Sequence, residues 1–220
     1  MKRVTFILLL VLFVAIMPLR AQYYFAIEDG SQASFRVYDN KGDVLGYYDE
    51  TLKIVSAESL DDIHAVLEQV YFDKDGKHLF KDKSSNLSLH IKEGEVTAKL
   101  ETIKQGMTTK DLMVRGCVIY VPSDIKSGDI LPDRTMSIKV GIIGGTIYLT
   151  ERKVLGMESV TVPAGTFNAA KVREKQKTKV AIISEEVTII SWMVKDLGCV
   201  RQESYDSKGR LVQIIEMVKK

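Results

Sequence analysis

Histidine side chains are the first place to look for chemistry in this chain, because imidazole serves both as a metal ligand and as a general base. The three histidines are His64, His78 and His90, and none of them lies in a His-x-x-x-His or similar ligand spacing. The sequence also lacks a Gly-x-Ser-x-Gly nucleophile elbow, a Cys-x-x-Cys pair and a phosphate-binding loop. We therefore predict isolated histidines on strands, no catalytic residue, no metal, no cofactor and no enzymatic activity. The remaining alternative is a hydrolase assembled from scattered Asp and Glu residues.

Cys117 and Cys199 are the only cysteines, and they allow two interpretations. In an oxidising compartment they could form a disulfide, which requires their Cα atoms to lie within ~7 Å of each other. Both also lie in apolar stretches, where an unpaired cysteine packs as a small hydrophobic side chain. Two cysteines so far apart in the sequence are too few ligands for a zinc site.

A stripe of basic residues is the most distinctive charge feature of the sequence. Every second residue of one strand-like run is basic, so the five side chains point to one face. They are Lys171, Arg173, Lys175, Lys177 and Lys179. The stripe could contact anionic lipid headgroups or an acidic partner. The alternative is an ordinary solvated outer face, or an edge strand that lysines protect against aggregation.

Short β-type runs, separated by turns rich in Gly, Asp and Asn, make up the chain from residue 22 onward. The clearest turns lie at 40–43, 73–76, 93–95, 144–145 and 206–209, and each offers a residue that tolerates positive φ. The runs between them are rich in Val, Ile, Thr, Tyr and Phe, which favours antiparallel strands over βαβ units. We predict an all-β, mainly antiparallel fold: a curved sheet or half-barrel, or two packed sheets, with at most short helices.

Residues 60–71 fit two patterns. Their apolar side chains recur at helical spacing, as Leu60, Ile63, Leu67, Val70 and Tyr71. Ser59 and Asp62 could cap such a helix. The stretch also has the pattern of a strand, because it ends in β-branched and aromatic residues and runs into the turn at 73–76. We favour the strand here, and expect a short helical turn around 108–112.

The N-terminus has the features of a secretory signal peptide. Lys2 and Arg3 precede an apolar run, and the small residue Ala21 stands where signal peptidase cuts. About 14 apolar residues span only ~21 Å as a helix, short of a ~30 Å hydrocarbon core. We therefore predict a cleaved signal at 1–21 and a single β-rich domain at 22–220, periplasmic or secreted in a bacterium, with no later transmembrane segment. No cysteine stands near the cut, so we do not expect a lipoprotein.

Net charge gives no reason to expect a nucleic-acid partner. The chain has 31 basic and 29 acidic residues, and signal cleavage would remove Lys2, Arg3 and Arg20. The mature chain is then close to neutral, whereas nucleic-acid binding normally requires an excess of basic residues.

Several short motifs resemble those of one protein family. The most specific is Val160-Thr161-Val162-Pro163-Ala164-Gly165-Thr166-Phe167. The others are Gly128-Asp129, Leu131-Pro132-Asp133, Trp192, Leu197-Gly198-Cys199-Val200-Arg201 and Tyr205-Asp206-Ser207-Lys208-Gly209. With these motifs most of the mature chain resembles the TapB-like family of exported bacterial proteins, whose function is unknown. The resemblance implies a mainly antiparallel fold similar to the curved half-barrels of periplasmic lipoprotein carriers. It also leads us to expect an aliphatic residue where Cys199 stands, so it does not imply a disulfide.

The motif residues have structural interpretations that need no active site. Pro163 and Gly165 suit a tight turn between two long strands, after which Phe167 returns to the core. Trp192 is interpreted as a core anchor, with a ligand contact as the alternative. The residues expected to form turns or loops are Asp129, Pro132, Asp133, Pro163, Gly165, Phe167 and Gly198.

Two functions fit these predictions. The first is a binding module whose curved sheet holds an apolar small molecule, a lipid or a lipoprotein tail in its concavity. The second is a scaffold that docks on another cell-envelope protein through an exposed strand edge or through the basic stripe.

Overall fold

The computed structural model describes residues 28–59, 62–79, 85–92, 95–100, 121, 124–140, 143–180 and 183–219. All regular secondary structure in these residues is β-strand, which confirms the predicted all-β class. The strands are β1 (Gln32–Asp39), β2 (Val44–Ser59), β3 (Asp62–Asp73), β4 (Ser85–Lys92), β5 (Glu95–Leu100), β6 (Arg134–Val140), β7 (Ile143–Val162), β8 (Gly165–Val180), β9 (Ile183–Val194), β10 (Gly198–Tyr205) and β11 (Leu211–Lys219). The described residues include no helix able to cross a membrane. The predicted signal, Cys117 and the turn expected at 108–112 lie outside them.

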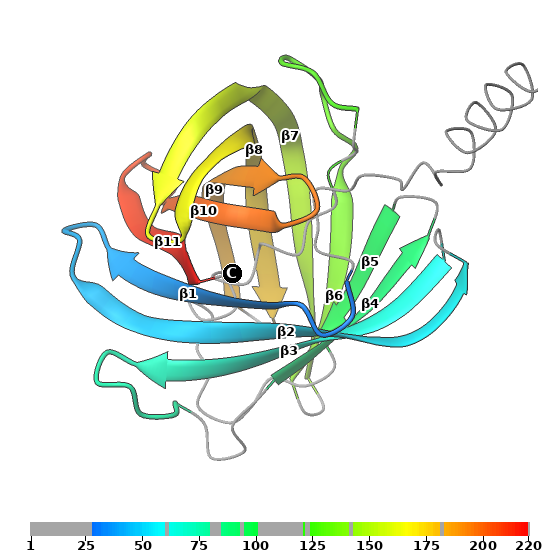
Figure 1. Ribbon diagram of the computed structural model, residues 1–220. Coiled ribbons are helices and arrows are strands. Elements are labelled where there is room, and N and C mark those ends of the chain that lie inside the picture. The colour runs from blue at the N-terminus through cyan, green and yellow to red at the C-terminus, as the bar shows by residue number, and fades with distance from the viewer. Residues whose placement is uncertain are drawn as a thin grey trace, which may run out of the picture.

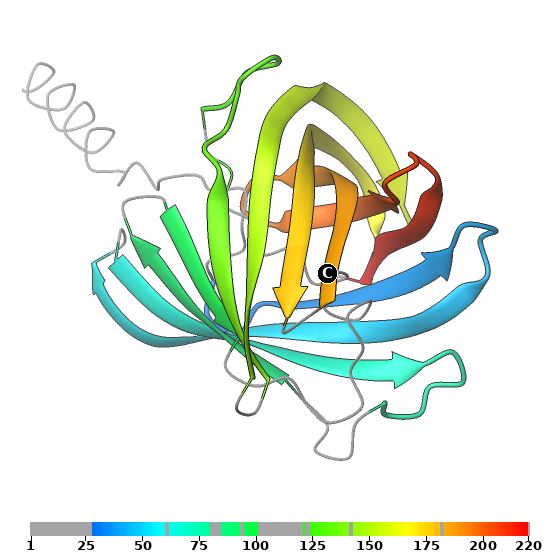
Figure 2. The same ribbon diagram turned by 180° about the vertical axis from the view of Figure 1, so that it is seen from behind.

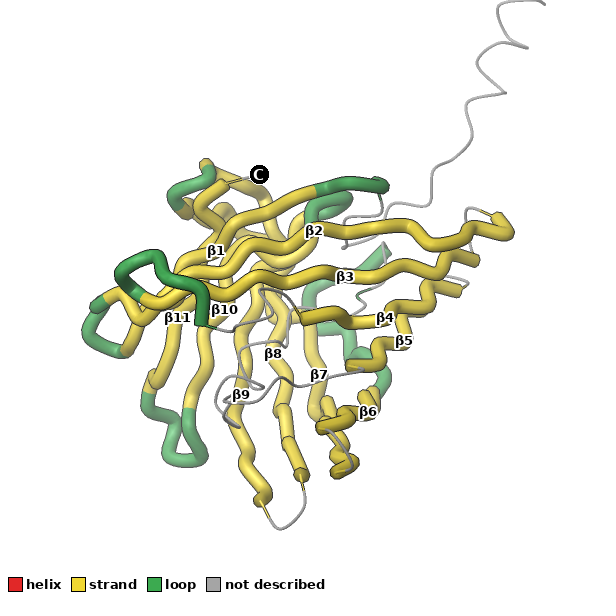
Figure 3. Tube along the Cα trace, turned by 90° about the horizontal axis from the view of Figure 1, so that it is seen from below, coloured by secondary structure: helices red, strands yellow, loops and turns green. Residues whose placement is uncertain are grey.

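Strand pairing follows the order of the chain. Each strand pairs with the next, and β1 also pairs with β11, so the pairing runs round a ring. All these pairings are antiparallel except that of β5 with β6, which is parallel. Among the described residues it joins Lys99 to Ser137 and Leu100 to Ile138. The antiparallel sheet is therefore continuous from β6 through β11 and β1 to β5. Figures 1 and 2 show β1 to β3 running across the direction of β7 to β9, and Figure 3 shows the strands following one another around a curve.

The segment with two possible patterns is a strand, β3. Its buried residues alternate along the strand, as Ile63, Ala65, Leu67, Gln69 and Tyr71. This period of two places one face of β3 on the core, which a helix over the same residues would not do. Residues 60 and 61 lie outside the described part of the chain.

Three hairpins use the same Asp-x-x-Gly turn, at 39–42, 73–76 and 206–209. In each turn the Asp Oδ1 accepts hydrogen bonds from the backbone N–H groups two and four residues later, at 2.8–3.0 Å. The Gly has a φ between 74° and 89°, a conformation that costs an L-residue about 1–2 kcal/mol. Local side-chain chemistry thus fixes where these hairpins turn, as the sequence predicted.

The described residues form two main hydrophobic clusters and a small third one, Val187 with Ile189. The larger joins β1 to β3 with β7 to β11, and it includes Phe35, Tyr48, Tyr71, Trp192 and Met217. Stacked rings extend from Phe35 through Tyr48 to Tyr71, with centroids 4.8 and 5.6 Å apart. The second main cluster comprises Val121, Leu131, Val154, Ala170, Val172, Met193 and Cys199. It packs the loop before β6 onto β7 to β10 and so adjoins the polar residues described next.

Candidate functional site

A β-bulge in β7 brings an arginine into the interior. Thr150 pairs with Lys175 and Lys153 pairs with Arg173, so two β7 residues, Glu151 and Arg152, lie opposite one β8 residue. Glu151 adopts a φ of 51° and remains exposed, whereas Arg152 is 1% exposed. The extra residue shifts the alternation of the strand by one position, and therefore Arg152 points inward.

Arg152 forms a buried ion pair with Glu174 of β8. Its Nε donates to Glu174 Oε2 at 3.1 Å, and its Nη1 donates to the carbonyl oxygen of Pro132 at 2.8 Å. Glu174 is 2% exposed. Burial raises the pKa of Glu174 to about 7, although the adjacent Arg152 guanidinium acts in the opposite direction. A carboxyl group that titrates near neutrality inside a sheet is a candidate functional group.

Other polar side chains continue this buried set on the inner face. Gln176, Thr178, Ser191, Gln202 and Ser204 are all at most 5% exposed. The Gln176 side chain donates to Thr178 Oγ1 at 3.3 Å, and that of Gln202 donates to Ser204 Oγ at 3.4 Å. Glu174 Oε1, Gln176 Oε1 and Ser191 Oγ are buried without a hydrogen-bond partner among the described residues. Such oxygens can accept hydrogen bonds from a ligand.

A cleft of about 650 Å³ lies where the β1–β2 and β10–β11 turns meet the start of β9. Its apolar lining comes from Leu45, Val187 and Val212, and its charged lining is acidic: Asp39, Glu185, Glu186 and Asp206. Ser184, Ser204, Ser207 and Gln213 complete it. No basic side chain is among these lining residues.

Strand register places the cleft beside the buried polar set. Val187 of the cleft is the cross-strand partner of Gln176. Ser204 pairs with Ile189, which in turn pairs with Glu174. The cleft and the buried polar residues are therefore neighbours on the same sheet, and together they form the candidate site.

Two carboxylates at the cleft are held in their charged form by their own turns. The backbone N–H groups of Asp43 and Lys41 lower the pKa of Asp39. The backbone N–H and the guanidinium of Arg210 lower the pKa of Asp206. Hydrogen bonds to an ionised carboxylate favour that state, so both groups carry negative charge at neutral pH.

The predicted basic stripe lies on the outer face of β8, and its Lys177 and Lys179 pair across the ladder with Glu186 and Ser184 of the cleft lining. Its five side chains are exposed or half-buried, whereas the intervening residues 172, 174, 176 and 178 are buried. Lys175 pairs with Glu151 at 2.7 Å and Lys171 with Glu158 at 3.2 Å. Lys179 lies over the ring of Tyr148. Part of the stripe is thus neutralised within the protein, and a contact through Lys171, Arg173, Lys175, Lys177 or Lys179 stays a prediction.

Trp192 is 6% exposed and belongs to the larger hydrophobic cluster. Its Nε1 donates to Glu158 Oε1 at 2.6 Å, a bond that lowers the pKa of Glu158. Lys171 and Arg201 lie over the ring, 4.8 and 5.5 Å from its centroid. Trp192 therefore packs in the core and is covered by charged side chains. A ligand contact by Trp192 stays a prediction.

Of the remaining motif residues, Asp129, Pro132, Asp133 and Pro163 lie in turns and loops, whereas Gly165, Phe167 and Gly198, predicted as turn residues, lie in the first residues of strands β8 and β10. Pro163 and Ala164 form the turn between β7 and β8, and Phe167 packs against the larger cluster. Gly165 and Gly198 have φ values of 139° and 94°. The backbone of Asp129 and Val154 pairs at 2.9 Å, and so does that of Leu131 and Arg152. The loop carrying Asp129, Pro132 and Asp133 thereby lies along the β7 bulge and supplies the Pro132 carbonyl to Arg152.

Cys199 is a buried thiol whose Sγ donates to the carbonyl oxygen of Arg201 at 3.2 Å. Because Cys117 lies outside the described residues, a disulfide between the two stays a prediction.

Arg152 and Glu174 were not identified from the sequence. For Glu174 a signal existed, since it alternates with the basic stripe and so falls on the opposite, inner face.

Comparison with known proteins gives a family and a fold. The family model described as DUF3108-like matches residues 28–217. No curated protein matches the sequence significantly. Two solved structures are similar to this chain, and each match covers 90% of this chain and 98% of the chain in the solved structure. One, from Bacteroides fragilis, is provisionally described as an exported protein with a YmcC-like fold, at 17% identity and a TM-score of 0.67. The other, from Parabacteroides distasonis, is provisionally described as a lipoprotein, at 16% identity and a TM-score of 0.68.

At these sequence identities the two structures show a shared fold and give no information about a shared function. The narrower TapB-like resemblance is not confirmed by the comparisons. Since one structure is described as an exported protein and the other as a lipoprotein, the expectation that this chain is not a lipoprotein has no support.

Proposed function

The chain belongs to the DUF3108-like family, and from this premise we propose that it is an exported cell-envelope protein that binds an amphipathic, lipid-like molecule. Export is supported by the signal-like segment at 1–21. The descriptions of the two structural relatives, as an exported protein and a lipoprotein, agree with an envelope location. In this proposal the protein binds its ligand without catalysing a reaction.

The observation that carries the proposal is the composition of the cleft. Its volume of about 650 Å³ lies in the usual range for small-molecule sites. Leu45, Val187 and Val212 offer apolar contacts, and Ser204 belongs to the buried polar set. The only charges in the lining are carboxylates. This combination favours an amphiphile whose polar end is cationic or donates hydrogen bonds, because the lining accepts hydrogen bonds and opposes negative charge.

A fluorescence assay with N-phenyl-1-naphthylamine, a neutral apolar probe, tests the cleft. We expect the probe to bind the purified protein, and dodecylamine to displace it at about tenfold lower concentration than dodecanoate. Glu185→Gln with Glu186→Gln should reduce that preference, because it removes two negative charges from the lining.

Lysine substitutions inside and outside the cleft show whether the probe binds in the cleft or elsewhere on the surface. Leu45→Lys with Val212→Lys places charge on two lining residues that are 51% and 42% exposed, and should weaken probe binding about tenfold. Val55→Lys is the matched control, since Val55 is 68% exposed and outside the cleft lining. Absence of probe binding, an equal response to amine and acid, or an equal loss in the control would each contradict the proposal.

A further inference from the structure

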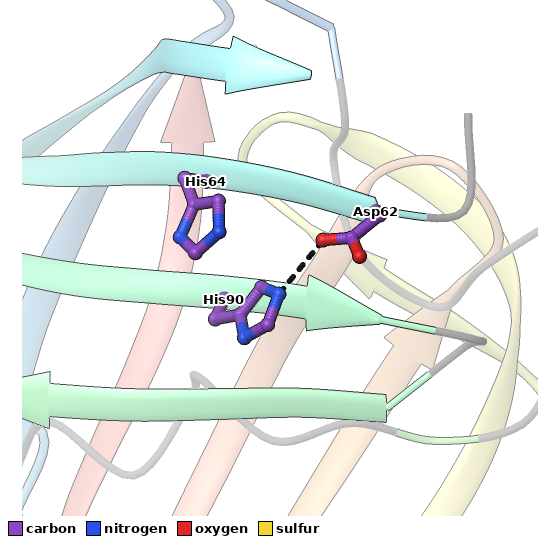
Figure 4. Close-up of side chains that lie close together, drawn as sticks. All are labelled: Asp62, His64 and His90. Atoms are coloured by element: carbon purple, nitrogen blue, oxygen red, sulfur yellow. Dashed lines mark hydrogen bonds and ion pairs between the residues drawn. The ribbon is translucent and has the colours of Figure 1, made fainter. Parts of the chain in front are cut away.

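Two histidines far apart in the sequence are direct neighbours on the outer face of the sheet. His64 of β3 pairs across the ladder with His90 of β4. Asp62 lies two residues before His64, so its side chain is on the same face. The buried residues of these strands, Ile63, Ala65 and Leu89, lie on the opposite face. Figure 4 shows the three polar side chains gathered over the two strands.

The three side chains offer donor atoms that already lie close together. One ligand atom from each of Asp62, His64 and His90 is within 4.8 Å of the other two. His90 Nε2 is 2.8 Å from Asp62 Oδ1. The imidazole rings of His64 and His90 are stacked, with centroids 4.1 Å apart and planes 9° from parallel.

We propose that Asp62, His64 and His90 form a binding site for a divalent transition-metal ion, with zinc as the test ion. Two imidazole nitrogens and one carboxylate oxygen are a common protein ligand set for such ions, and water completes the coordination. Zinc bonds of about 2.0–2.2 Å require the donors to come closer than 4.8 Å. Rotation of the two rings can achieve this, because the paired strands already hold their Cβ atoms about 5 Å apart.

Lys92 positions the carboxylate of this site. Its Nζ lies 2.9 Å from Asp62 Oδ2, which leaves Oδ1, the oxygen now bonded to His90, facing the histidines. The metal ion would replace the hydrogen bond between His90 and Asp62 Oδ1. The nearby ammonium opposes the charge of the ion, so affinity in the micromolar range is expected rather than the tight binding of a structural zinc site. The site is on the outer face and does not depend on ligand binding in the cleft.

Isothermal titration of the purified protein, free of a polyhistidine tag, with ZnCl₂ tests this proposal. We expect one saturable site, weakened by at least about tenfold in His64→Ala, His90→Ala and Asp62→Asn. His78→Ala is the matched control, because His78 is exposed and lies against Phe72 rather than in the cluster. Circular dichroism checks that each variant is folded, and His90→Gln replaces His90→Ala if that variant is not.

Titration with cobalt provides a second measurement, because visible absorption reports the coordination of the metal ion directly. Titration with CoCl₂ should give visible absorption bands in the wild type and in His78→Ala, and these should be lost in His64→Ala. The proposal is overturned if the wild type shows no saturable zinc binding, if His64→Ala and His90→Ala bind as the wild type does, or if His78→Ala loses binding equally.

Discussion

Arg152 and Glu174 are the residues of the candidate site whose environment differs most from water. Both are at most 2% exposed, and taking two charges out of water costs free energy that their attraction recovers only in part. The pair is therefore a poor source of stability for the fold. Its position beside the cleft, with Glu174 Oε1 unbonded among the described residues, is instead suited to a polar group of a ligand.

Stability should fall with rising pH because of Glu174. Below pH 4.5 its carboxyl group is protonated in both the folded and the unfolded chain. Between 4.5 and about 7 the unfolded chain releases a proton that the folded protein keeps, so the free energy of unfolding decreases as pH rises. The change in pKa corresponds to roughly 3 kcal/mol once pH exceeds 7.

Comparison with Glu174→Gln isolates this effect from that of other carboxyl groups. Urea unfolding, followed by the fluorescence of Trp192, the single tryptophan, is measured for both proteins from pH 4.5 to 8. We expect the wild type to lose roughly 3 kcal/mol relative to the variant over this range. A difference that does not change with pH would show that Glu174 titrates normally.

At the scale of the element, the β7 bulge determines what the site contains. Without the extra residue, the alternation would carry Glu151 inward and Arg152 to the surface. The bulge places Glu151 outside, where it pairs with Lys175, and Arg152 inside against Glu174. It does so with a backbone conformation at Glu151 that L-residues rarely adopt.

Substitutions at Glu151 measure the cost of that conformation. Glu151→Gly relieves about 1 kcal/mol of backbone strain but loses an exposed ion pair of similar or smaller value, so stability should change little. Glu151→Val loses the same ion pair and puts a β-branched residue at positive φ, so it should be less stable than the glycine variant by about 1–2 kcal/mol. Urea unfolding gives both values, and equal stability of the two variants would argue against the bulge.

At the scale of the whole molecule, the shortest pairing between described residues of the ring is that of β5 with β6. In the part of the chain that the structure describes, β5 and β6 share two residue pairs, whereas β8 and β9 pair continuously from Ala170–Met193 to Val180–Ile183. Because few ladder pairs join the described residues of this seam, we expect it to open at a lower free energy than the rest of the sheet.

Amide hydrogen exchange followed by mass spectrometry can locate this opening. Peptides from β5 (Glu95–Leu100) and β6 (Arg134–Val140) should exchange at least about tenfold faster than those from β8. The β1–β11 pairing, which also joins distant parts of the chain, provides an internal comparison and should be better protected than the seam. Equal protection of β5, β6 and β8 would contradict this description.

The sequence alone determined the features that depend on near neighbours along the chain. The Asp-x-x-Gly turns follow from one side chain bonding to backbone groups two and four residues away. The strand at β3 and the outward-facing basic stripe on β8 follow from alternation with a period of two. The period also implied an inward Glu174, although its significance was not apparent without its partner.

Only the tertiary structure decided which distant residues meet. His64 and His90 are adjacent because of the β3–β4 register, and no spacing in the sequence indicates that register. Arg152 is buried because the loop before β6 and the extra residue of the bulge turn it toward Glu174. Local propensity depends on a few neighbouring residues, whereas register, bulges and the closing of β1 on β11 depend on how all the strands pack together, and the candidate sites depend on that packing.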